Sequence, residues 1–154
     1  MDLARNLKVE SVSRLNPSAP LQIRPSQSEL DAVHLMRREG VGCVLVCDAE
    51  RLLGIFTERD LMRRVLAHGK PLSVPVADCM TVNPVAVHPK EPIGSAVRRM
   101  EEGGYRHLPV VDGDRPVGLL SVKRIVHYLV EQFPGTVYNL PPVPGMVQQE
   151  REGA

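Results

Sequence analysis

The stretch VGCVLVCDAERLLGIFTERDL, residues 41–61, decides the fold class. Its first seven residues form an apolar run rich in valine, which predicts a buried strand. The polar tetrapeptide DAER predicts a turn, after which residues 52–56 return as a second strand. Thr57 has a hydroxyl suited to cap a helix that carries the apolar residues Leu61 and Val65. A strand, a turn, a strand and a helix in this order predict an α/β protein.

The same pattern occurs a second time further along the chain. Residues 12–66 align with residues 76–130 without a gap, so that glycines, prolines and acids coincide. Two copies of so short a unit are expected to pack on each other, because one copy cannot bury its own apolar face. Residues 1–11 lead into the first copy, and residues 67–75 join the two. The expected strands are 21–23, 41–47 and 52–56 in the first copy and 85–87, 106–111 and 116–120 in the second, with helices at 28–40, from 57 onward, at 92–102 and from 121 onward.

A tail rich in proline, residues 131–154, follows the second copy. It contains QFPGTVYNLPPVPG, and this density of proline and glycine predicts an extended chain without a helix. Its apolar residues Val137, Tyr138 and Leu140 are candidates for docking on the body or on a second chain.

Composition narrows the functional classes. The chain has 154 residues, with 19 lysines and arginines against 18 acids and no tryptophan. Balanced charge and an aromatic content of 3% argue against a nucleic-acid binder, which needs a basic surface and stacking rings. A hydrophobic content of 43% is typical of a folded domain rather than a disordered chain.

Neither a membrane span nor a secretory leader is predicted. No apolar run reaches bilayer length, and the first ten residues hold no apolar signal-peptide core. Cys43, Cys47 and Cys79 cannot all pair within one chain, so a cytoplasmic location is the default expectation. Cys43 and Cys47 lie on one strand and are interpreted as buried thiols, because no histidine at a zinc-motif spacing completes a metal site.

The corner GIFTERDL, residues 54–61, is the first candidate binding site. A strand ends there, Thr57 stands at the turn, and Asp60 follows at the start of a helix. A carboxylate can accept hydrogen bonds from both hydroxyls of a ribose, and the helix N-terminus together with Arg59 favours an anion nearby. The same spacing is that of a capping box, in which the threonine and the acid satisfy backbone N–H groups. From spacing alone, the cap is the commoner of the two interpretations.

The segment GGYRHLPVVD, residues 103–112, is the second candidate site. Tyr105, Arg106 and His107 precede an apolar strand, and an arginine with a histidine can bind a phosphate. The alternative is a solvated arginine beside a structural histidine.

Together these motifs resemble a pair of CBS domains, also called a Bateman module. The matching stretches are GIFTERDL at 54–61, GLLSVKRI at 118–125, the turns CDAERLLG and VDGDRPVG, and CMTVNPVAVHP at 79–89. Each motif alone is degenerate, but the two copies together cover residues 10–130 at the right spacing. The resemblance implies an α/β fold of two βαββα repeats related by a pseudo-twofold axis. It also implies clefts between the repeats that bind AMP, ADP or ATP, and assembly as a homodimer.

The resemblance further implies which residues would bind the adenosine ligand. In the first cleft, the acid that binds the ribose comes from the first copy, and the contacts to the base come largely from the second. Arg63 and Arg64 are interpreted as a solvated helix face from which either could reach a phosphate. The residues expected in the first cleft are Ile55, Thr57, Arg59, Asp60, Met80, Asn83, Val85, Tyr105, Arg106 and His107.

The second cleft is expected to be empty or weak. Arg124 stands where the first copy has Asp60, and an arginine cannot accept hydrogen bonds from ribose hydroxyls. A different anion held by Arg124 is the alternative. The residues expected around this cleft are Asn16, Leu21, Val41, Gly42, Ser121 and Arg124.

The sequence therefore predicts a regulatory module that senses an adenosine ligand and signals to an unknown protein partner, without a cofactor or a metal. No P-loop, nucleophile elbow, dinucleotide-binding glycine motif or zinc-protease motif is present. The alternatives are a non-binding interaction module that recruits a partner through residues 138–142, an enzyme acting on a nucleotide, and a nucleic-acid binder. The apolar helix residues expected to be covered in the homodimer are Leu61, Val65, Ile125 and Leu129.

Overall fold

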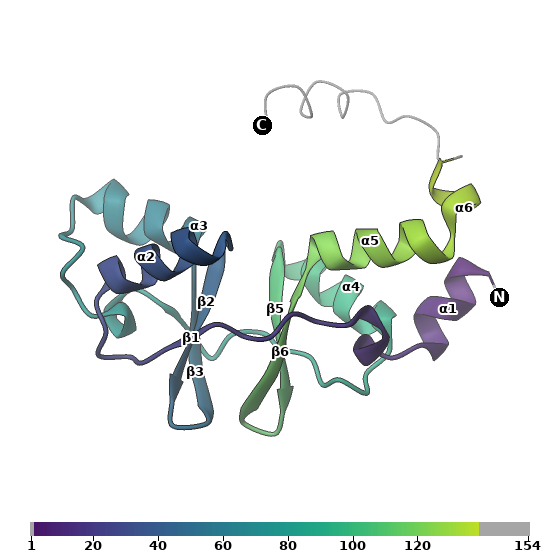
Figure 1. Cartoon of the computed structure of the whole chain (residues 1–154), viewed down its shortest axis with the longest axis horizontal. Helices are drawn as coiled ribbons and strands as arrows, with labels where there is room; N and C mark the ends of the chain where they lie inside the picture. Colours follow the sequence, from purple (N-terminus) through teal and green to yellow (C-terminus); the bar gives the residue numbers. More distant parts are fainter. Residues whose placement is uncertain (1, 139–154) are drawn as a thin grey trace.

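The first repeat is built on a four-stranded sheet in the order β1-β2-β3-β4 (Figure 1). The computed structural model describes residues 2–138. Strands β1 and β2 are parallel, while β3 pairs antiparallel with both β2 and β4. The elements are β1 (Gln22–Ile23), α2 (Glu29–Glu39), β2 (Cys43–Asp48), β3 (Arg51–Thr57), α3 (Glu58–Asp60), the helical segments Leu61–Val65 and Leu66–His68, and β4 (Thr81–Val82).

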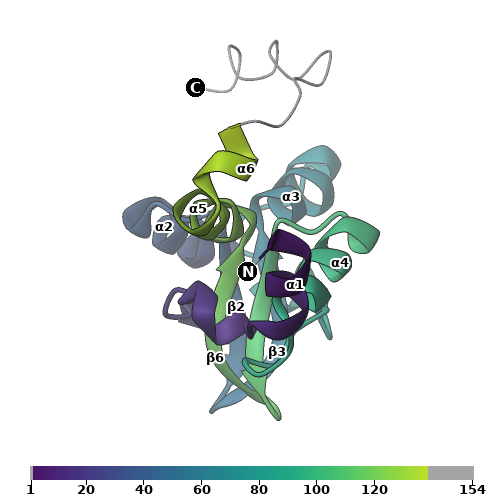
Figure 2. The same ribbon diagram turned by 90° about the vertical axis from the view of Figure 1, so that its right-hand side faces the viewer.

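The second repeat is built on the antiparallel hairpin of β5 (His107–Asp112) and β6 (Arg115–Ser121). Helix α4 (Ile93–Gly103) precedes the hairpin and α5 (Val122–Gln132) follows it. The β2–β3 and β5–β6 hairpins stand side by side at the centre of the molecule, and their turns point the same way (Figures 1 and 2). The expected α/β architecture of two repeats is thus confirmed. The strand expected over residues 85–87 is not, because it is reduced to a single bridge.

The two repeats exchange the segments with which they begin. Val12 and Leu15 are buried in the core of the second repeat. In return, Val76 and Cys79 are buried in the core of the first repeat, and β4 joins its sheet. The sequence predicts each segment as the start of its own repeat, 12–66 or 76–130. The packing differs because each repeat leaves apolar surface that the leading segment of the other covers, which ties the two into one body.

The lead-in also packs on the second repeat. It forms helix α1 (Leu3–Val9), which begins where the Asp2 side chain accepts a hydrogen bond from the N–H of Arg5 at 2.8 Å. This helix lies against α4, and the hydroxyl of Tyr128 donates to Oδ1 of Asn6 at 3.1 Å. Residues 1–11 therefore cover the second repeat instead of only leading into the first.

Two helices show how far local signals determine the structure. Helix α2 has both predicted ends, since Ser28 accepts from the N–H of Asp31 at 3.1 Å and Gly40 takes the left-handed φ of 65°. The helix expected after Thr57 differs from the prediction. It begins there as α3, but it widens into a π-helical turn over Leu61–Val65 and then narrows to a 3-10 segment. Wide turns of this kind are frequent at functional sites.

The beginning of the tail is helical, which corrects the expectation of an extended chain. Helix α6 spans Pro134–Tyr138. A proline is tolerated in the first turn of a helix, where its missing N–H would have no partner. The docking expected of the side chains of Val137, Tyr138 and Leu140, and the recruitment of a partner through residues 138–142, concern positions outside the described residues and side chains.

The exposed apolar residues of the helices differ from those expected. Val65 and Ile125 are 0% and 6% exposed, because each packs in the core of its own repeat. The helical residues that do leave large apolar surface exposed near Val65 and Ile125 are Met62, Leu66, Val122 and Val126.

No helix in the part of the chain that the structure describes is long and apolar enough to cross a membrane.

Candidate functional site

A cavity of about 640 Å³ lies at the junction of the two repeats. The end of β3, helix α3 and the turn after it, the segment around β4 and the chain that enters β5 form its walls. Its volume is in the range of cavities that bind small organic ligands. The lining residues are Gly42, Ile55, Thr57, Glu58, Arg59, Asp60, Arg63, Arg64, Thr81, Val82, Asn83, Pro84, Val85, Gly104, Tyr105, Arg106, His107 and Pro109.

Nine of the ten residues expected in the first cleft line this cavity. Met80 is the exception. Its side chain packs in the core of the first repeat beside Gly54, where a Cβ atom would come within 2.6 Å of the Met80 sulfur. Gly42, which was expected in the second cleft, lies in the wall of the first.

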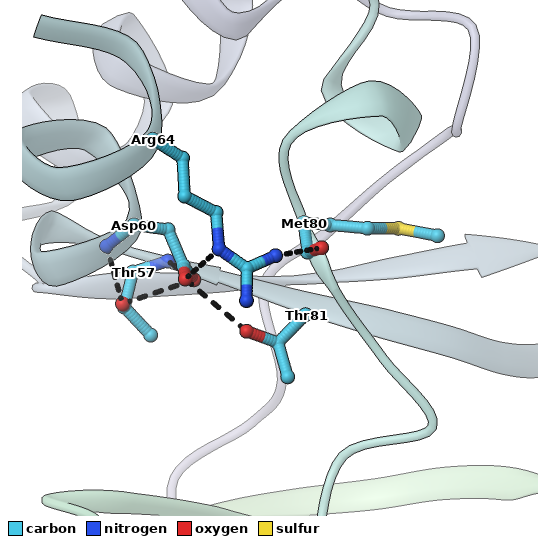
Figure 3. A network of polar contacts seen from close by, with 5 residues as sticks. All are labelled: Thr57, Asp60, Arg64, Met80 and Thr81. Atoms are coloured by element: carbon cyan, nitrogen blue, oxygen red, sulfur yellow. Dashed lines mark hydrogen bonds and ion pairs between the residues drawn. The ribbon is translucent and has the colours of Figure 1, made fainter. Parts of the chain in front are cut away.

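Asp60 has a buried side chain that the first repeat itself holds in place. Its Oδ2 accepts hydrogen bonds from the N–H of Thr57 at 3.0 Å and from the Thr57 hydroxyl at 3.1 Å. In return, Oγ1 of Thr57 accepts from the N–H of Asp60 at 3.1 Å (Figure 3). The capping box that the spacing predicted is therefore present.

The other oxygen of Asp60 has partners from two further elements (Figure 3). The hydroxyl of Thr81 donates to Oδ1 at 3.1 Å, and Nε of Arg64 lies 3.5 Å from the same oxygen. Nη1 of Arg64 also donates to the backbone carbonyl of Met80 at 2.7 Å. The Asp60 carboxylate thus links helix α3, the π-helical turn and the segment that begins the second repeat.

Four arginines line the cavity, against two acids. Arg59 donates from Nη1 to the carbonyl of Gly104 at 3.2 Å and so connects the two repeats. Arg63 and Arg106 have exposed side chains and form no ion pair within residues 2–138. The excess of positive charge favours an anionic ligand.

Another part of the wall is apolar. Val82, Val85 and Tyr105 are 58%, 40% and 39% exposed. Side chains of this kind, gathered in one cavity with polar groups, offer dispersion contacts to a flat ring. The wall therefore combines an apolar surface with a cationic one.

His107 lies where β5 begins, close to Gly42 and Glu58 of the first repeat. Burial lowers the pKa of His107, the Glu58 carboxylate raises it, and Arg106 and Lys123 lower it again, with a net shift below its ordinary value. The imidazole is therefore neutral at pH 7, with one nitrogen as a donor and the other as an acceptor. It can therefore offer a ligand a donor or an acceptor rather than a positive charge.

Some residues of the cavity wall were not predicted, because the sequence around them carries only weak signals of secondary structure. Thr81 and Val82 form the two-residue strand β4, which pairs with Ile55 and Gly54 of β3. A strand of two residues shows no alternation of apolar and polar side chains, so only the fold reveals its place. The other lining residues that were not anticipated are Glu58, Pro84, Gly104 and Pro109.

The residues expected around the second cleft have other surroundings. Nη2 of Arg124 donates to the hydroxyl of Ser18 at 3.4 Å, and Ser121 caps helix α5 by accepting from the N–H of Arg124 at 3.2 Å. Leu21 and Val41 pack against the core of the first repeat. A weak or empty second cleft stays a prediction.

Cys43 and Cys47 are buried thiols, as predicted, and Cys79 is buried as well. Burial raises the pKa of Cys43 to about 12 and, as the largest cause, raises the pKa of Cys47 and Cys79 to about 11, so all three stay protonated. Among the described residues, no group of three or more histidine, cysteine or acidic side chains is placed to hold a metal ion.

Comparison of the sequence with known proteins finds the CBS domain family, whose model matches residues 12–67 and 76–131. A CBS domain-containing protein of Arabidopsis thaliana is 34% identical over 125 residues. The alignment covers 80% of this chain and 23% of the plant protein, so this chain spans about a quarter of the length of that relative. The name of that relative describes no enzyme.

Solved structures share the fold. A CBS-domain containing protein from Agrobacterium tumefaciens is 30% identical with a TM-score of 0.71, and the match covers 77% of this chain and 98% of that one. A CBS domain protein from Pyrobaculum aerophilum, solved as a complex with AMP, has a TM-score of 0.71 at 21% identity. That match covers 79% of this chain and 99% of the other, and it concerns the fold alone.

Proposed function

The chain belongs to the family of CBS-domain proteins, and we propose that it is a regulatory module that binds AMP, ADP or ATP between its two repeats. The observation that carries the proposal is the composition of the cavity at the junction. A carboxylate, an apolar surface and several arginines face a single space of nucleotide size.

Each part of the ligand has a chemically suitable partner. The Asp60 carboxylate would accept hydrogen bonds from the ribose hydroxyls. Val85 and Tyr105 would cover the faces of the adenine ring. Arg63 and Arg106, which have no acidic partner among the described residues, would bind the phosphate. The complex of the Pyrobaculum aerophilum protein with AMP adds support, because that protein has the same fold.

The position of the cavity suits a sensor. A ligand held by both repeats would favour one arrangement of them over others, and a partner protein that prefers this arrangement would respond to occupancy. We propose no catalytic role for Asp60, since the capping box already uses it as an acceptor of backbone and hydroxyl hydrogen bonds.

We also propose that the module is a homodimer. Met62 and Val126 are 60% and 50% exposed on helical segments of the two repeats, and Leu66 and Val122 add to the exposed apolar surface. A second copy of the chain would cover this surface through an isologous interface.

Titration calorimetry and thermal unfolding with AMP, ADP and ATP test the nucleotide site. A hundredfold excess over the dissociation constant should stabilise the fold by about 2.7 kcal/mol. Mass spectrometry of molecules released from the purified protein would identify a ligand that copurifies. If no adenine nucleotide shifts the melting temperature at millimolar concentration, the nucleotide site is rejected. The complete capping box would then favour the second candidate function, a non-binding interaction module.

A further inference from the structure

Three hydrogen bonds and one ion pair surround the Asp60 carboxylate. Its two oxygens offer about four acceptor positions. The N–H and hydroxyl of Thr57 lie 3.0 and 3.1 Å from Oδ2. The hydroxyl of Thr81 and Nε of Arg64 lie 3.1 and 3.5 Å from Oδ1 (Figure 3). A ribose diol that binds this carboxylate therefore competes with these neighbours, and two new hydrogen bonds require at least one of the four contacts to give way.

Arg64 is the donor that can leave most easily. The N–H of Thr57 belongs to the backbone, and the Thr57 hydroxyl is fixed by the reciprocal bond of the capping box. Arg64 makes the longest of the four contacts, and its side chain is 48% exposed on a long flexible stem. The same guanidinium holds the Met80 carbonyl, so its departure would break two interactions.

Whether the Arg64 guanidinium finds a new anionic partner after it separates from Asp60 depends on the ligand. Arg64 lines the same cavity as Arg63 and Arg106. A nucleoside offers it no anion, so the lost pair with Asp60 is not replaced. A nucleotide brings a phosphate, with which an arginine forms a charge-assisted and often bidentate pair.

We propose that Arg64 makes the site selective for phosphorylated adenosine compounds, because it exchanges Asp60 for the ligand phosphate when the ribose binds. The inference rests on the proposed nucleotide site and adds a residue that decides between two ligand classes. In this mechanism the Arg64–Asp60 pair disfavours nucleosides, and the pair of Arg64 with the phosphate favours nucleotides.

The test compares adenosine with AMP, which differ only in the phosphate, by titration calorimetry on the wild type and on Arg64→Met. Arg64→Met removes the ion-pair partner of Asp60 and should tighten adenosine binding about two- to fivefold. This factor corresponds to the free energy of a partly exposed ion pair. Loss of the phosphate contact should weaken AMP binding about tenfold or more. The preference for AMP over adenosine should therefore fall by more than tenfold.

Arg63→Met is the matched control, because Arg63 lines the same cavity but forms no ion pair among the described residues. It should weaken AMP binding and leave adenosine binding unchanged. Arg64→Gln is the second variant, for the case that Arg64→Met folds poorly, because a glutamine can still donate to the Met80 carbonyl. It should show the same loss of preference for AMP over adenosine.

Two failures can be told apart. If the wild type binds none of AMP, ADP and ATP, the proposed nucleotide site is wrong, and the role of Arg64 is rejected with it. If the wild type binds AMP but adenosine binds Arg64→Met and Arg64→Gln no more tightly than the wild type, the exchange at Asp60 is rejected and the nucleotide site stands.

Discussion

The hydroxyl of Thr81 donates to Oδ1 of Asp60 at 3.1 Å and joins the start of the second repeat to the acid in helix α3 of the first. The polar centre of the cavity is therefore assembled by both repeats. Because the repeats also exchange their leading segments, a change at Asp60 acts on the junction as a whole. This coupling makes Asp60 the first residue to substitute.

Asp60→Asn should weaken AMP binding about ten- to a hundredfold, since an amide is a poorer acceptor for a ribose diol than a carboxylate. The variant should also lose on the order of 1 kcal/mol of stability, because one oxygen of the side chain becomes an NH₂ group that faces donors. Calorimetry and thermal unfolding measure the two effects. Asp48→Asn, at the exposed end of β2, is the control and should change neither. Binding at full affinity by Asp60→Asn would place the ligand elsewhere.

Glu91 and Arg99 should make stability depend on pH. Nη1 and Nη2 of Arg99 donate to Glu91 at 2.9 and 2.7 Å, and the N–H of His88 donates at 2.6 Å. Burial raises the pKa of Glu91, but these hydrogen bonds outweigh it, and the pKa falls below 4.5. The folded state then binds this proton less tightly than the unfolded state. The stabilisation is therefore present above pH 4.5 and is lost as the pH falls through the lowered pKa.

Thermal unfolding of the wild type and Glu91→Gln between about pH 3 and pH 7 tests the direction in which stability changes with pH. The wild type should be the more stable protein at about pH 7, and the difference should shrink toward about pH 3. Glu50→Gln, in the exposed turn between β2 and β3, should show no difference that varies with pH. A gap between wild type and Glu91→Gln that grows in acid would contradict the assignment.

The homodimer should depend on Met62 and Val126. Light scattering should give the wild type a mass near twice 17.0 kDa at micromolar concentration. Met62→Glu with Val126→Glu should give a single chain, because a glutamate on each helix cannot be buried in an apolar interface without a partner. Val9 is 60% exposed at the end of α1, which carries neither substituted residue, and Val9→Glu should stay dimeric. If the wild type were a monomer, or if the double variant were still a dimer, the surface around Met62 and Val126 would not be a dimer interface.

Local chemistry predicted the regular elements well. Ser28 and Gly40 mark the ends of α2 because a hydroxyl cap and a left-handed glycine act within a few residues of themselves. The run at 43–48 forms a buried strand for the same local reason. The residues alone indicated two separate candidate sites, around Asp60 and around Arg106, and the resemblance to a family placed them in one cleft. The spacing of Thr57 and Asp60 by itself favoured the capping box, which is present, over the ribose site that it also allowed.

The parts that were not predicted depend on contacts between distant segments. Nothing near Val12 or Val76 in the sequence indicates that each packs in the core of the other repeat. Asn16 and Asn83 share a left-handed φ of 50° and 48° and both precede a proline, although a gapless alignment of the copies does not pair them. The first copy therefore carries extra residues between this asparagine and β1. The donors around Asp60 come from three elements, so sequence spacing could not show that the carboxylate is already satisfied.

Glu29 should weaken the fold that it belongs to. It is 0% exposed at the start of α2, and neither carboxylate oxygen has a hydrogen-bond partner among the described residues. The neighbouring Cys79 thiol is only a weak donor to this carboxylate. Because a buried polar group without a partner keeps its full desolvation cost, Glu29→Met should raise the free energy of unfolding by about 1–3 kcal/mol. Urea denaturation measures this gain, and Glu39→Met, on the exposed end of the same helix, should change stability by less than about 0.5 kcal/mol. A loss of stability in Glu29→Met relative to Glu39→Met would show that the carboxylate supports the fold.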